Sequence, residues 1–348
     1  MSERVLVGMS GGVDSAVAAL LLMRAGYEVI GVTFLLWTGE GSGVEESVRD
    51  AASICARLGI EHTVLDLAED FHREVIDAFI ASYESGETPN PCVTCNRRIK
   101  FSKLLEKADE MRAKYVATGH YARVEKVECG EYLLKKAVDE GKDQSYFLYA
   151  LGQAELSRVL FPLGDYTKAE IRAIAEENGF VNARKRDSQD ICFVTDGDYA
   201  AFIEKYMGKS FPIGDFVDGE GKVLGKHKGA IRYTVGQRKG LGVALGRPMF
   251  VCAKDMVKNT VTLGENEDLF SHTLTARDAR FVTEMKIGQP VPVAAKIRNT
   301  QKETAALLTR IDEVHFRVDF DVPQRAIARG QSVVLYAGDT VLGGGIIE

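Results

Sequence analysis

Several features that define other classes of protein are missing from this sequence of 348 residues. No basic segment followed by a long apolar run stands at its start, so no signal peptide is expected. No uncharged stretch of about 18 residues occurs elsewhere, which predicts a cytoplasmic chain without membrane spans. The six histidines are dispersed and form no His-x-x-x-His pair, so zinc ligation by histidine has little support.

Cysteine is also scarce, because six residues are too few and too scattered for a disulfide scaffold at this size. Cys55, Cys129 and Cys252 fit small buried hydrophobic residues. Cys92 and Cys95 differ, because they form a CxxC pair in PNPCVTCNRRIKF, between a proline-stiffened turn and a basic cluster. Such a pair can be half of a zinc site, a redox pair, part of an iron–sulfur site or a sulfur-transfer centre.

The net charge of −6 argues by itself against a nucleic-acid partner, but the basic residues are unevenly distributed. Eight Lys or Arg and no Asp or Glu lie between Lys222 and Lys254, and shorter basic clusters lie at 97–100 and 184–186. This segregation indicates a local surface for a polyanion on an otherwise repelling body. A solvated basic face without a partner also fits.

The first half alternates short apolar runs with amphipathic stretches. Strands are expected at 4–9, 28–37, 62–67 and 113–121, with helices at 14–27 and 44–60. This alternation predicts a doubly wound α/β domain with a parallel sheet, in which ligands bind beyond the carboxyl ends of the strands.

The second half changes character after a helix-like stretch at 196–209. Short β segments with glycine and proline between them are expected at 229–237, 248–255 and 259–265, and alternating segments from about Ser271 predict an antiparallel barrel or sandwich. The expected organisation is a catalytic α/β domain (1–203), a small central domain (204–270) and a C-terminal antiparallel β-barrel (271–348).

A glycine-rich hexapeptide, SGGVDS at residues 10–15, stands between the first expected strand and helix. Glycines let the backbone approach an anion, and the N–H groups at a helix start point toward it. Neither the Walker nor the dinucleotide-binding spacing is present. Because Asp14 would repel a phosphate, a divalent cation is expected between them, which predicts a magnesium–pyrophosphate complex. A simple turn with Asp14 as a helix cap is the alternative.

These residues resemble the PP-loop of the ATP pyrophosphatase superfamily, whose members cleave ATP between the α and β phosphates and adenylate an oxygen. Further motifs follow in order over nearly the whole chain: NPCVTCN (90–96), IKF (99–101), ATGHYAR (117–123), KDQSYFL (142–148), DSQDICF (187–193), YTVGQRKGLG (233–242) and the terminal LGGGII. The ordered set resembles the bacterial tRNA-uridine 2-sulfurtransferase (MnmA) family, which thiolates the wobble uridine of tRNAs of the Lys, Glu and Gln type.

The resemblance implies a set of binding residues. Those expected to bind ATP are Gly8, Met9, Ser10, Gly11, Gly12, Val13, Asp14, Ser15, Phe34 and Gly119. Those expected at the target base are Asn90, Pro91 and Cys92. Those expected to contact tRNA are His120, Lys142, Asp143, Gln144, Arg298, Asn299 and Gln331.

Replacing the C2 oxygen of uracil by sulfur requires activation of that oxygen and delivery of a nucleophilic sulfur. By the resemblance, Cys95 is the nucleophile and Cys192 the persulfide carrier, loaded by a sulfur-donor protein such as a cysteine desulfurase or a relay protein. AMP departs, and the two cysteines can end as a disulfide. The nearby Arg97, Arg98 and Lys100 are expected to favour the thiolate. Without the resemblance, Cys192 in the apolar run ICFV would fit an inert core thiol.

One residue departs from the family pattern. Cys92 stands where the best-known version has an acid, in Asn-Pro-Asp-x-x-Cys. Cys92, Cys95 and Cys192 could instead hold a [4Fe–4S] cluster with one open iron, since full ligation takes four ligands. The residues leave the persulfide and cluster routes open.

Three other functions were weighed. A PP-loop ligase that adenylates a small-molecule carboxyl would leave the cysteines and basic segments without a role. An RNA-binding module with a decayed ATP site is disfavoured by the intact Ser10, Asp14 and Ser15. A structural zinc half-site needs two more ligands, and no second CxxC exists. The expected protein is therefore an ATP-dependent, magnesium-dependent enzyme that acts on tRNA as a monomer.

Overall fold

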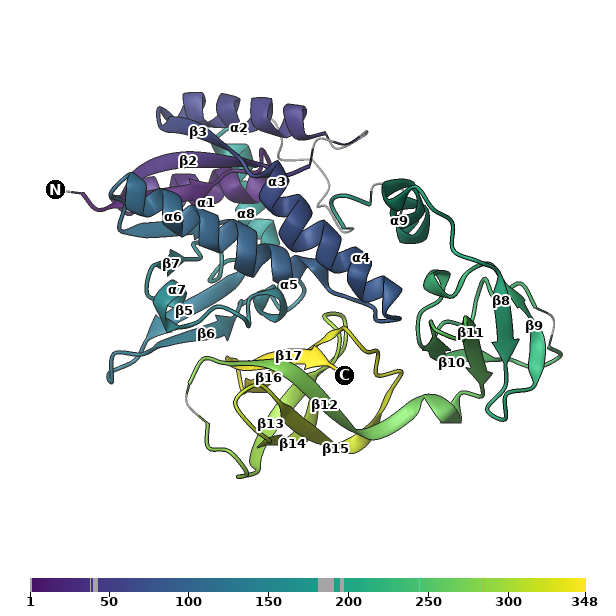
Figure 1. Ribbon diagram of the computed structural model, residues 1–348. Helices are drawn as coiled ribbons and strands as arrows, with labels where there is room; N and C mark the ends of the chain where they lie inside the picture. The colour runs from purple at the N-terminus through teal and green to yellow at the C-terminus, as the bar shows by residue number, and fades with distance from the viewer. Residues whose placement is uncertain are drawn as a thin grey trace.

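The computed structural model describes residues 2–37, 39, 43–180, 191–194, 197–243, 245–283 and 285–348. They form an α/β unit, a small β unit to one side and a β-barrel below the α/β unit in the view of Figure 1. Nowhere in the described ranges does a helix combine the length and the apolar character that crossing a bilayer requires.

The α/β unit is built on a parallel sheet in the order β3-β2-β1-β4-β7. The strands are β1 (Arg4–Gly8), β2 (Glu28–Leu35), β3 (Glu61–Asp66), β4 (Tyr115–Thr118) and β7 (Val159–Leu160). The main covering helices are α1 (Val13–Arg24), α2 (Val44–Leu58), α6 (Ser102–Glu110) and α8 (Lys168–Glu177). The predicted doubly wound sheet is confirmed.

Side chains of β1 show how the two faces are filled. Val5 and Val7 pack with α1, α2 and α8, whereas Leu6 packs on the other face with α6. All three are fully buried, as expected of a central parallel strand with successive side chains on opposite faces. The carboxyl end of β1 therefore leads from a rigid core directly into the glycine-rich hexapeptide.

Two helical stretches between β3 and β4 contain π-helical turns. The first runs through α3 (Ala68–Phe71), η1 (His72–Ile76) and α4 (Asp77–Glu84), and the second through α5 (Pro91–Cys95), η2 (Asn96–Phe101) and α6. Shorter elements complete the unit: β5 (Ala122–Lys126), β6 (Tyr132–Lys136), η3 (Ser145–Phe147) and α7 (Gln153–Leu156). Because π-helical turns often mark functional sites, the position of η2 directly after Cys95 is notable.

The small β unit follows α9 (Tyr199–Met207) and has a four-stranded sheet in the order β10-β11-β8-β9. Its strands are β8 (Gly214–Val217), β9 (Val223–His227), β10 (Phe250–Asp255) and β11 (Thr260–Gly264). The strand expected at 229–237 is wrong: this stretch holds a 3-10 turn, η5 (Ala230–Arg232), and loop. Gly229 and Gly236 have φ values of +106° and +90°, which interrupt an extended run.

The C-terminal unit is the antiparallel β-barrel that was predicted. After η6 (Glu267–Leu269) come β12 (Phe270–Phe281), β13 (Val291–Lys296), β14 (Thr304–Arg310), β15 (Phe316–Arg325), β16 (Ser332–Ala337) and β17 (Thr340–Ile347). The order β12-β15-β14-β13-β16-β17 is closed by pairing of β12 with β17. Closure removes the free edges of these six strands.

The hairpin β5–β6 of the α/β unit extends the barrel sheet. Thr340 and Val341 of β17 pair with Lys135 and Leu134 of β6. The first and last units therefore share one hydrogen-bonded sheet, although they are far apart in the chain. The division into residues 1–203, 204–270 and 271–348 remains a proposal.

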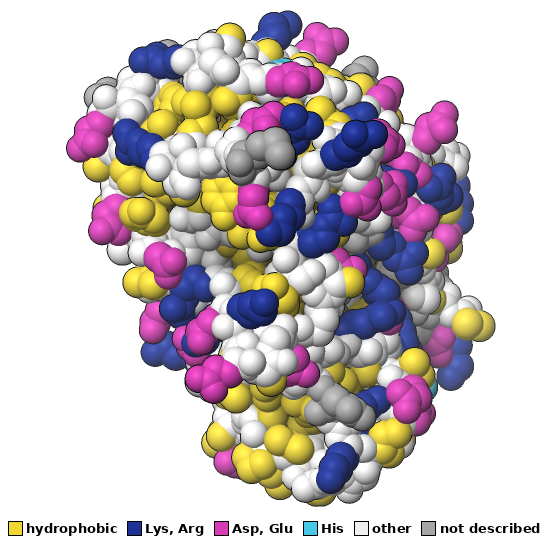
Figure 2. All heavy atoms as spheres, turned by 90° about the vertical axis from the view of Figure 1, so that its left-hand side faces the viewer, with side chains coloured by type: hydrophobic (Ala, Val, Ile, Leu, Met, Phe, Trp, Pro, Cys, Tyr) yellow, Lys and Arg dark blue, Asp and Glu magenta, His cyan; other side chains and the backbone are white. Residues whose placement is uncertain are grey.

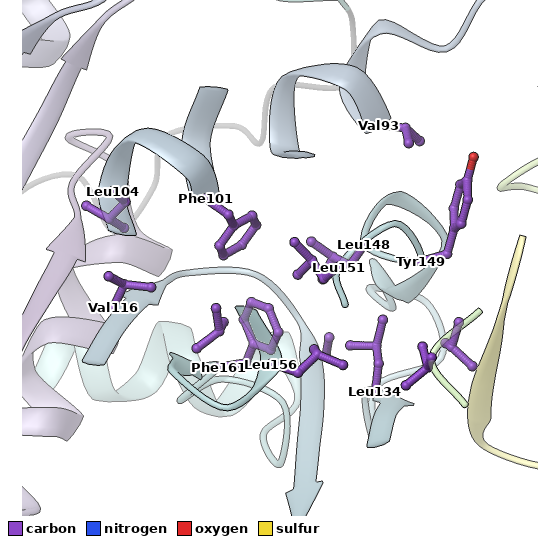
Figure 3. Packing of buried hydrophobic residues seen from close by; sticks show 14 of the residues in the cluster. Val93, Phe101, Leu104, Val116, Leu134, Leu148, Tyr149, Leu151, Leu156 and Phe161 are labelled. Carbon is purple, nitrogen blue, oxygen red and sulfur yellow. The ribbon is translucent and has the colours of Figure 1, made fainter. Parts of the chain in front are cut away.

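One large hydrophobic cluster lies behind this junction. It combines Leu6, Phe101 and Leu134 with Tyr149 and Val93. Figure 3 shows Val93, the residue after Cys92, next to Tyr149 at the end of the cluster. The cysteine pair is therefore attached to a rigid core.

On the face of the molecule in Figure 2, Lys and Arg side chains lie interspersed with Asp and Glu.

Candidate active site

The PP-loop, residues 10–15, follows β1 at the carboxyl end of the sheet and includes the first residues of α1. Gly12 is the N-cap of α1 and has no side chain with which to cap it, so first-turn N–H groups remain for a ligand. Gly11 has a φ of +73°, and a Cβ there would lie 2.7 Å from the carbonyl oxygen of Ser47. Glycine is therefore required at position 11.

The two serines of the PP-loop have different roles. Ser15 is 3% exposed, and its hydroxyl donates to the carbonyl of Gly12 at 3.1 Å and accepts from the N–H of Ser10 at 3.2 Å. Ser10 is exposed, and its Oγ lies 3.2 Å from that of Ser15. Ser15 therefore shapes the loop, whereas Ser10 can reach a bound phosphate.

Asp14 makes contacts that the sequence did not predict. Its two carboxylate oxygens accept from Nζ of Lys168 at 2.7 and 2.8 Å, and one of them accepts from the hydroxyl of Tyr121 at 2.9 Å. The carboxylate thus bonds to side chains, and the helix-cap alternative has no support. The Lys168 side chain is 9% exposed, so a nearly buried ammonium neutralises Asp14 inside the loop.

The capping box of Thr167 and Glu170, readable in the sequence as TKAE, marks the start of the helix that carries Lys168. That signal predicts a helix end but not its partner across the fold. Lys168 supplies a positive charge that compensates Asp14 without a metal ion. Asp14 and Lys168 still form a charged pair suited to a phosphate–cation complex.

Other residues expected at ATP lie at the same edge of the sheet. A Cβ on Gly119 would lie 2.8 Å from the backbone of Asp14 and Ser15, so glycine lets β4 approach the PP-loop. Phe34, near the end of β2, is half-buried and packs on the hydrophobic cluster that contains Cys95. It also lies beside Gly8, where a Cβ would be 3.8 Å from its ring. Phe34 thus lies between the end of β1, which leads into the PP-loop, and the cluster that contains Cys95, and its contact with adenosine remains a prediction.

The CxxC pair occupies helix α5, which begins at Pro91 with Asn90 as N-cap. Cys92 is exposed and Cys95 is buried. Cys192 is also exposed, which argues against an inert core thiol. Phe193, the next residue, is buried in the same cluster as Cys95 and anchors this part of the chain. Residues 187–190 of the DSQDICF motif lie outside the described ranges.

The thiols influence one another electrostatically. Burial raises the pKa of Cys95 to about 12, Lys100 opposes the rise, and the neighbouring Cys192 and Cys92 add to it. Cys92 and Cys192 are exposed as residues, yet the surrounding protein desolvates their thiols and raises the pKa of both. At neutral pH all three are therefore mainly thiols.

Of the three basic residues expected to lower the pKa of the thiols, Lys100 has this effect. Arg97 pairs with Asp278 at 3.0 Å and Arg98 with Glu74 at 2.6 Å, so their charges are compensated elsewhere. Lys100 lowers the pKa of each of the three thiols. The expectation that Arg97 and Arg98 favour the thiolate is wrong, because neither contributes to lowering the pKa of Cys95.

Metal ligation by the cysteines has no support in their arrangement. Within the described ranges, no group of three or more His, Cys, Asp or Glu is arranged to hold a metal ion. As placed, Cys92, Cys95 and Cys192 are therefore not gathered as the ligands of a single metal ion. Cys92 and Cys192 lie close enough to Cys95 for their charges to raise its pKa.

Comparisons with known proteins cover the whole chain. Family models match in succession: a tRNA methyl transferase HUP domain over residues 3–196, a tRNA methyl transferase PRC-barrel domain over 200–265 and an aminomethyltransferase beta-barrel domain over 271–347. The tRNA-specific 2-thiouridylase MnmA of Clostridioides difficile (strain 630) is 49% identical and covers 100% of this chain and 99% of its own length. The protein of that name from Acetivibrio thermocellus is 48% identical, over 99% of each chain. The chain belongs to the MnmA family.

A solved structure resembles part of this MnmA-family chain. The U34-tRNA thiolase NcsA from Methanococcus maripaludis with its [4Fe-4S] cluster is 19% identical, covers 59% of this chain and 67% of its own, and has a TM-score of 0.37. A likeness of this extent carries no conclusion about the cysteines of the MnmA-family protein described here.

The tRNA contacts expected near the sheet have partners within the protein. Gln144 accepts from the N–H of Tyr121 at 2.9 Å, and Asp143 accepts from the hydroxyl of Ser145 at 2.8 Å. Lys142, next to them, is also engaged in contacts. Desolvation lowers the pKa of His120 to about 3, so its ring is neutral at physiological pH. These residues shape the rim beside the PP-loop, and their contacts with tRNA remain predictions.

The three residues expected to contact tRNA from the barrel differ in setting. Asn299 is exposed, whereas Arg298 donates to the carbonyls of Arg325 and Ala326. Gln331 donates its amide to the carbonyl of Thr88 at 2.9 Å, just before the Asn90–Pro91–Cys92 segment. Gln331 therefore supports the segment expected at the target base.

Proposed function

We propose that this chain is an ATP-dependent tRNA-uridine 2-sulfurtransferase, which converts the wobble uridine of Lys-, Glu- and Gln-type tRNAs to 2-thiouridine with release of AMP and pyrophosphate. The observation that carries the proposal is the position of Phe34, which lies beside Gly8 at the end of the strand that leads into the PP-loop and packs on the cluster that holds Cys95. The names of the full-length relatives agree with it. The matching domain descriptions mention methyl transfer, but an adenylating loop beside thiols suits sulfur transfer better.

The first step activates the uracil. The C2 oxygen attacks the α-phosphorus of ATP, an O–P bond forms, and the bond to the β-phosphate oxygen breaks, so pyrophosphate leaves. The N–H groups of the PP-loop and the hydroxyl of Ser10 hold the phosphates, and Lys168 balances the charge of Asp14. Mg²⁺ bound with ATP would neutralise further phosphate charge; Asp14 is the residue placed to approach it.

The second step delivers sulfur. A sulfur-donor protein, a cysteine desulfurase or relay, loads Cys192 as Cys–S–SH, which its exposure permits. The terminal sulfur attacks C2, and AMP leaves with the former C2 oxygen. The Cys95 thiolate then attacks the Cys192 sulfur, which releases 2-thiouridine and leaves a Cys95–Cys192 disulfide. An external thiol reduces this disulfide before the next turnover.

Cys92 is not required by this sequence of steps. It shares a helix face with Cys95 because the two are three residues apart. Asn90, Pro91 and Cys92 precede the buried nucleophile and form the segment proposed to face the target base. No step is assigned to iron, because among the described residues these thiols are not arranged as ligands of a metal ion.

The working form proposed is a monomer that acts in the cytoplasm, where its tRNA substrate is found. His120, residues 142–144, Arg298, Asn299 and Gln331 are proposed to border the bound tRNA. The domain division at about residues 203 and 270 is part of the same proposal.

The test supplies the protein with ATP, wobble-uridine tRNA and a persulfide donor. Pyrophosphate and 2-thiouridine are measured in the same reaction, and equal amounts are expected. Cys95→Ser and Cys192→Ser should still release a first equivalent of pyrophosphate and form no 2-thiouridine. Absence of tRNA-dependent pyrophosphate release by the unaltered protein would overturn the proposal, as would transfer of a methyl group instead of sulfur.

A further inference from the structure

The segment that carries the CxxC pair, residues 87–97, is held at its first residue by the barrel. Glu87 is 8% exposed, and both its carboxylate oxygens accept from Nη2 of Arg277 on β12, at 3.0 and 2.9 Å. A carboxylate this buried is costly without a charged partner. The ion pair therefore fixes the chain just before Asn90.

The same strand holds the last residue of the segment. Arg97, on the π-helical turn η2, donates from Nη1 to Asp278 at 3.0 Å. Arg280 donates to the other oxygen of Asp278 at 2.9 and 3.2 Å, so the carboxylate is itself fixed in place. Arg277 thus holds the chain before Cys92, and Asp278 holds it after Cys95.

Neighbouring residues of a regular strand point to opposite faces of the sheet. Between Arg277 and Arg280, however, the register of β12 against β17 shifts, and Asp278 has a φ of +50°. A bulge of this kind redirects side chains and is common near functional sites. It allows Arg277 and Asp278 both to reach the cysteine segment.

The turn before β16 adds a third attachment. The N–H of Thr88 donates to the carbonyl of Arg329 at 2.8 Å, and Gln331 donates to the carbonyl of Thr88. Gly330 lies between Arg329 and Gln331, and a Cβ on Gly330 would be 2.7 Å from the Cβ of Glu87. The barrel backbone therefore packs directly on the start of the cysteine segment.

We propose that Arg277 and Asp278 are positioning residues for sulfur transfer: the bulge of β12 holds both ends of residues 87–97 and so fixes Cys95 relative to Cys192 and the adenylated base. This inference rests on the proposed role of Cys95. Arg277 and Asp278 bond to Glu87, Arg97 and Arg280 and not to residues 10–15, so loss of the two side chains should slow sulfur transfer more than adenylation. The barrel thereby acts on the chemistry itself, besides its expected contact with tRNA.

Asp278→Asn is the main test variant, because asparagine tolerates a left-handed backbone and removes the charge that binds Arg97. Arg277→Met removes the other attachment, and Arg277→Lys keeps its charge. Glu303→Gln is the matched control: Glu303 pairs with Lys136 of β6, another link between the α/β unit and the barrel, but one that does not involve the cysteine segment.

Each full-length variant is given ATP, tRNA and a persulfide donor, and first-turnover pyrophosphate and 2-thiouridine are followed together. Because small misplacements of reacting groups are costly, 2-thiouridine formation should slow about 10- to 100-fold in Asp278→Asn and Arg277→Met. Pyrophosphate release should fall much less than 2-thiouridine formation, because residues 10–15 keep their own bonds in these variants. Arg277→Lys should recover most of the rate, and Glu303→Gln should lose none.

Alkylation of Cys95, mapped by mass spectrometry, gives a readout that does not depend on turnover. Release of the segment should speed alkylation in Asp278→Asn and leave Glu303→Gln unchanged. Unaltered thiolation in Asp278→Asn, equal losses in Glu303→Gln, or a parallel loss of pyrophosphate release would overturn the inference. Failure of the unaltered protein to thiolate tRNA would instead reject the proposed function. If Arg277→Met does not fold, Asp278→Asn decides.

Discussion

In the PP-loop, the hydrogen bonds of Ser10 and Ser15 stay within residues 10–15, whereas the cysteine segment is fixed by Arg277 and Asp278 from the opposite end of the chain. The hydrogen bonds of the two PP-loop serines are local and hold the loop in shape from within. The position of the cysteine segment depends on correct docking of the barrel. The loop proposed to activate the substrate and the segment proposed to transfer sulfur are thus held in place by different means.

The largest effect is expected where the local loop depends on one distant residue. Lys168→Met should lower kcat/KM for ATP by about 100-fold, because it leaves Asp14 without its ammonium partner next to incoming phosphates. Pyrophosphate release and thiolation should fall together, in contrast to the Asp278 variant. Steady-state assays over a range of ATP concentrations measure this, with Lys258→Met, an exposed lysine, as control. An unchanged kcat/KM would show that the loop does not depend on Lys168.

The pH dependence should also separate the two regions. With the pKa of Cys95 raised to about 12, the thiolate fraction increases with pH across the range 7 to 9. If attack by Cys95 limits sulfur transfer, the single-turnover rate should rise about tenfold per pH unit there. First-turnover pyrophosphate release should change far less. A thiolation rate that levels off below pH 8 would mean that the thiolate forms more readily than this burial implies.

The smallest effect is expected at Cys92. Cys92→Ser should keep thiolation within about threefold of the unaltered rate, since the thiol route uses Cys95 and Cys192. Protein purified without oxygen should thiolate tRNA without bound iron. About four iron atoms and four sulfides per chain, lost in Cys92→Ala, would show instead that the cysteines rearrange to bind a cluster.

The sequence predicted what local pattern determines. Alternating apolar runs located the parallel sheet, and SGGVDS located the loop at its edge. The partners of that loop could not be read in the same way: Lys168 and Tyr121 lie far along the chain and are joined to Asp14 by the fold alone. Thiol reactivity was misjudged for the same reason, because Arg97 and Arg98 are basic in sequence but are paired in space.

Two further features of the structure could not be read from the sequence. The segment at 229–237 has the composition of a strand, but left-handed glycines at both ends prevent an extended run. The bond from the Gln331 amide to the Thr88 carbonyl, beside Gly330, has no signal in the sequence, and the expected contact of Gln331 with tRNA stays a prediction. Such contacts between distant segments leave no periodic signal in the sequence.

The hairpin β5–β6, which pairs with β17, also affects how the protein unfolds. Because one hydrogen-bonded sheet joins the two ends of the chain, the α/β unit and the barrel should lose structure in a single cooperative transition. The small β unit has its own sheet and hydrophobic cluster and lies outside this continuity. In the topology of the chain, the small β unit is an insertion between the α/β unit and the barrel. The C-terminal strand β17 joins these two parts through its pairing with β6.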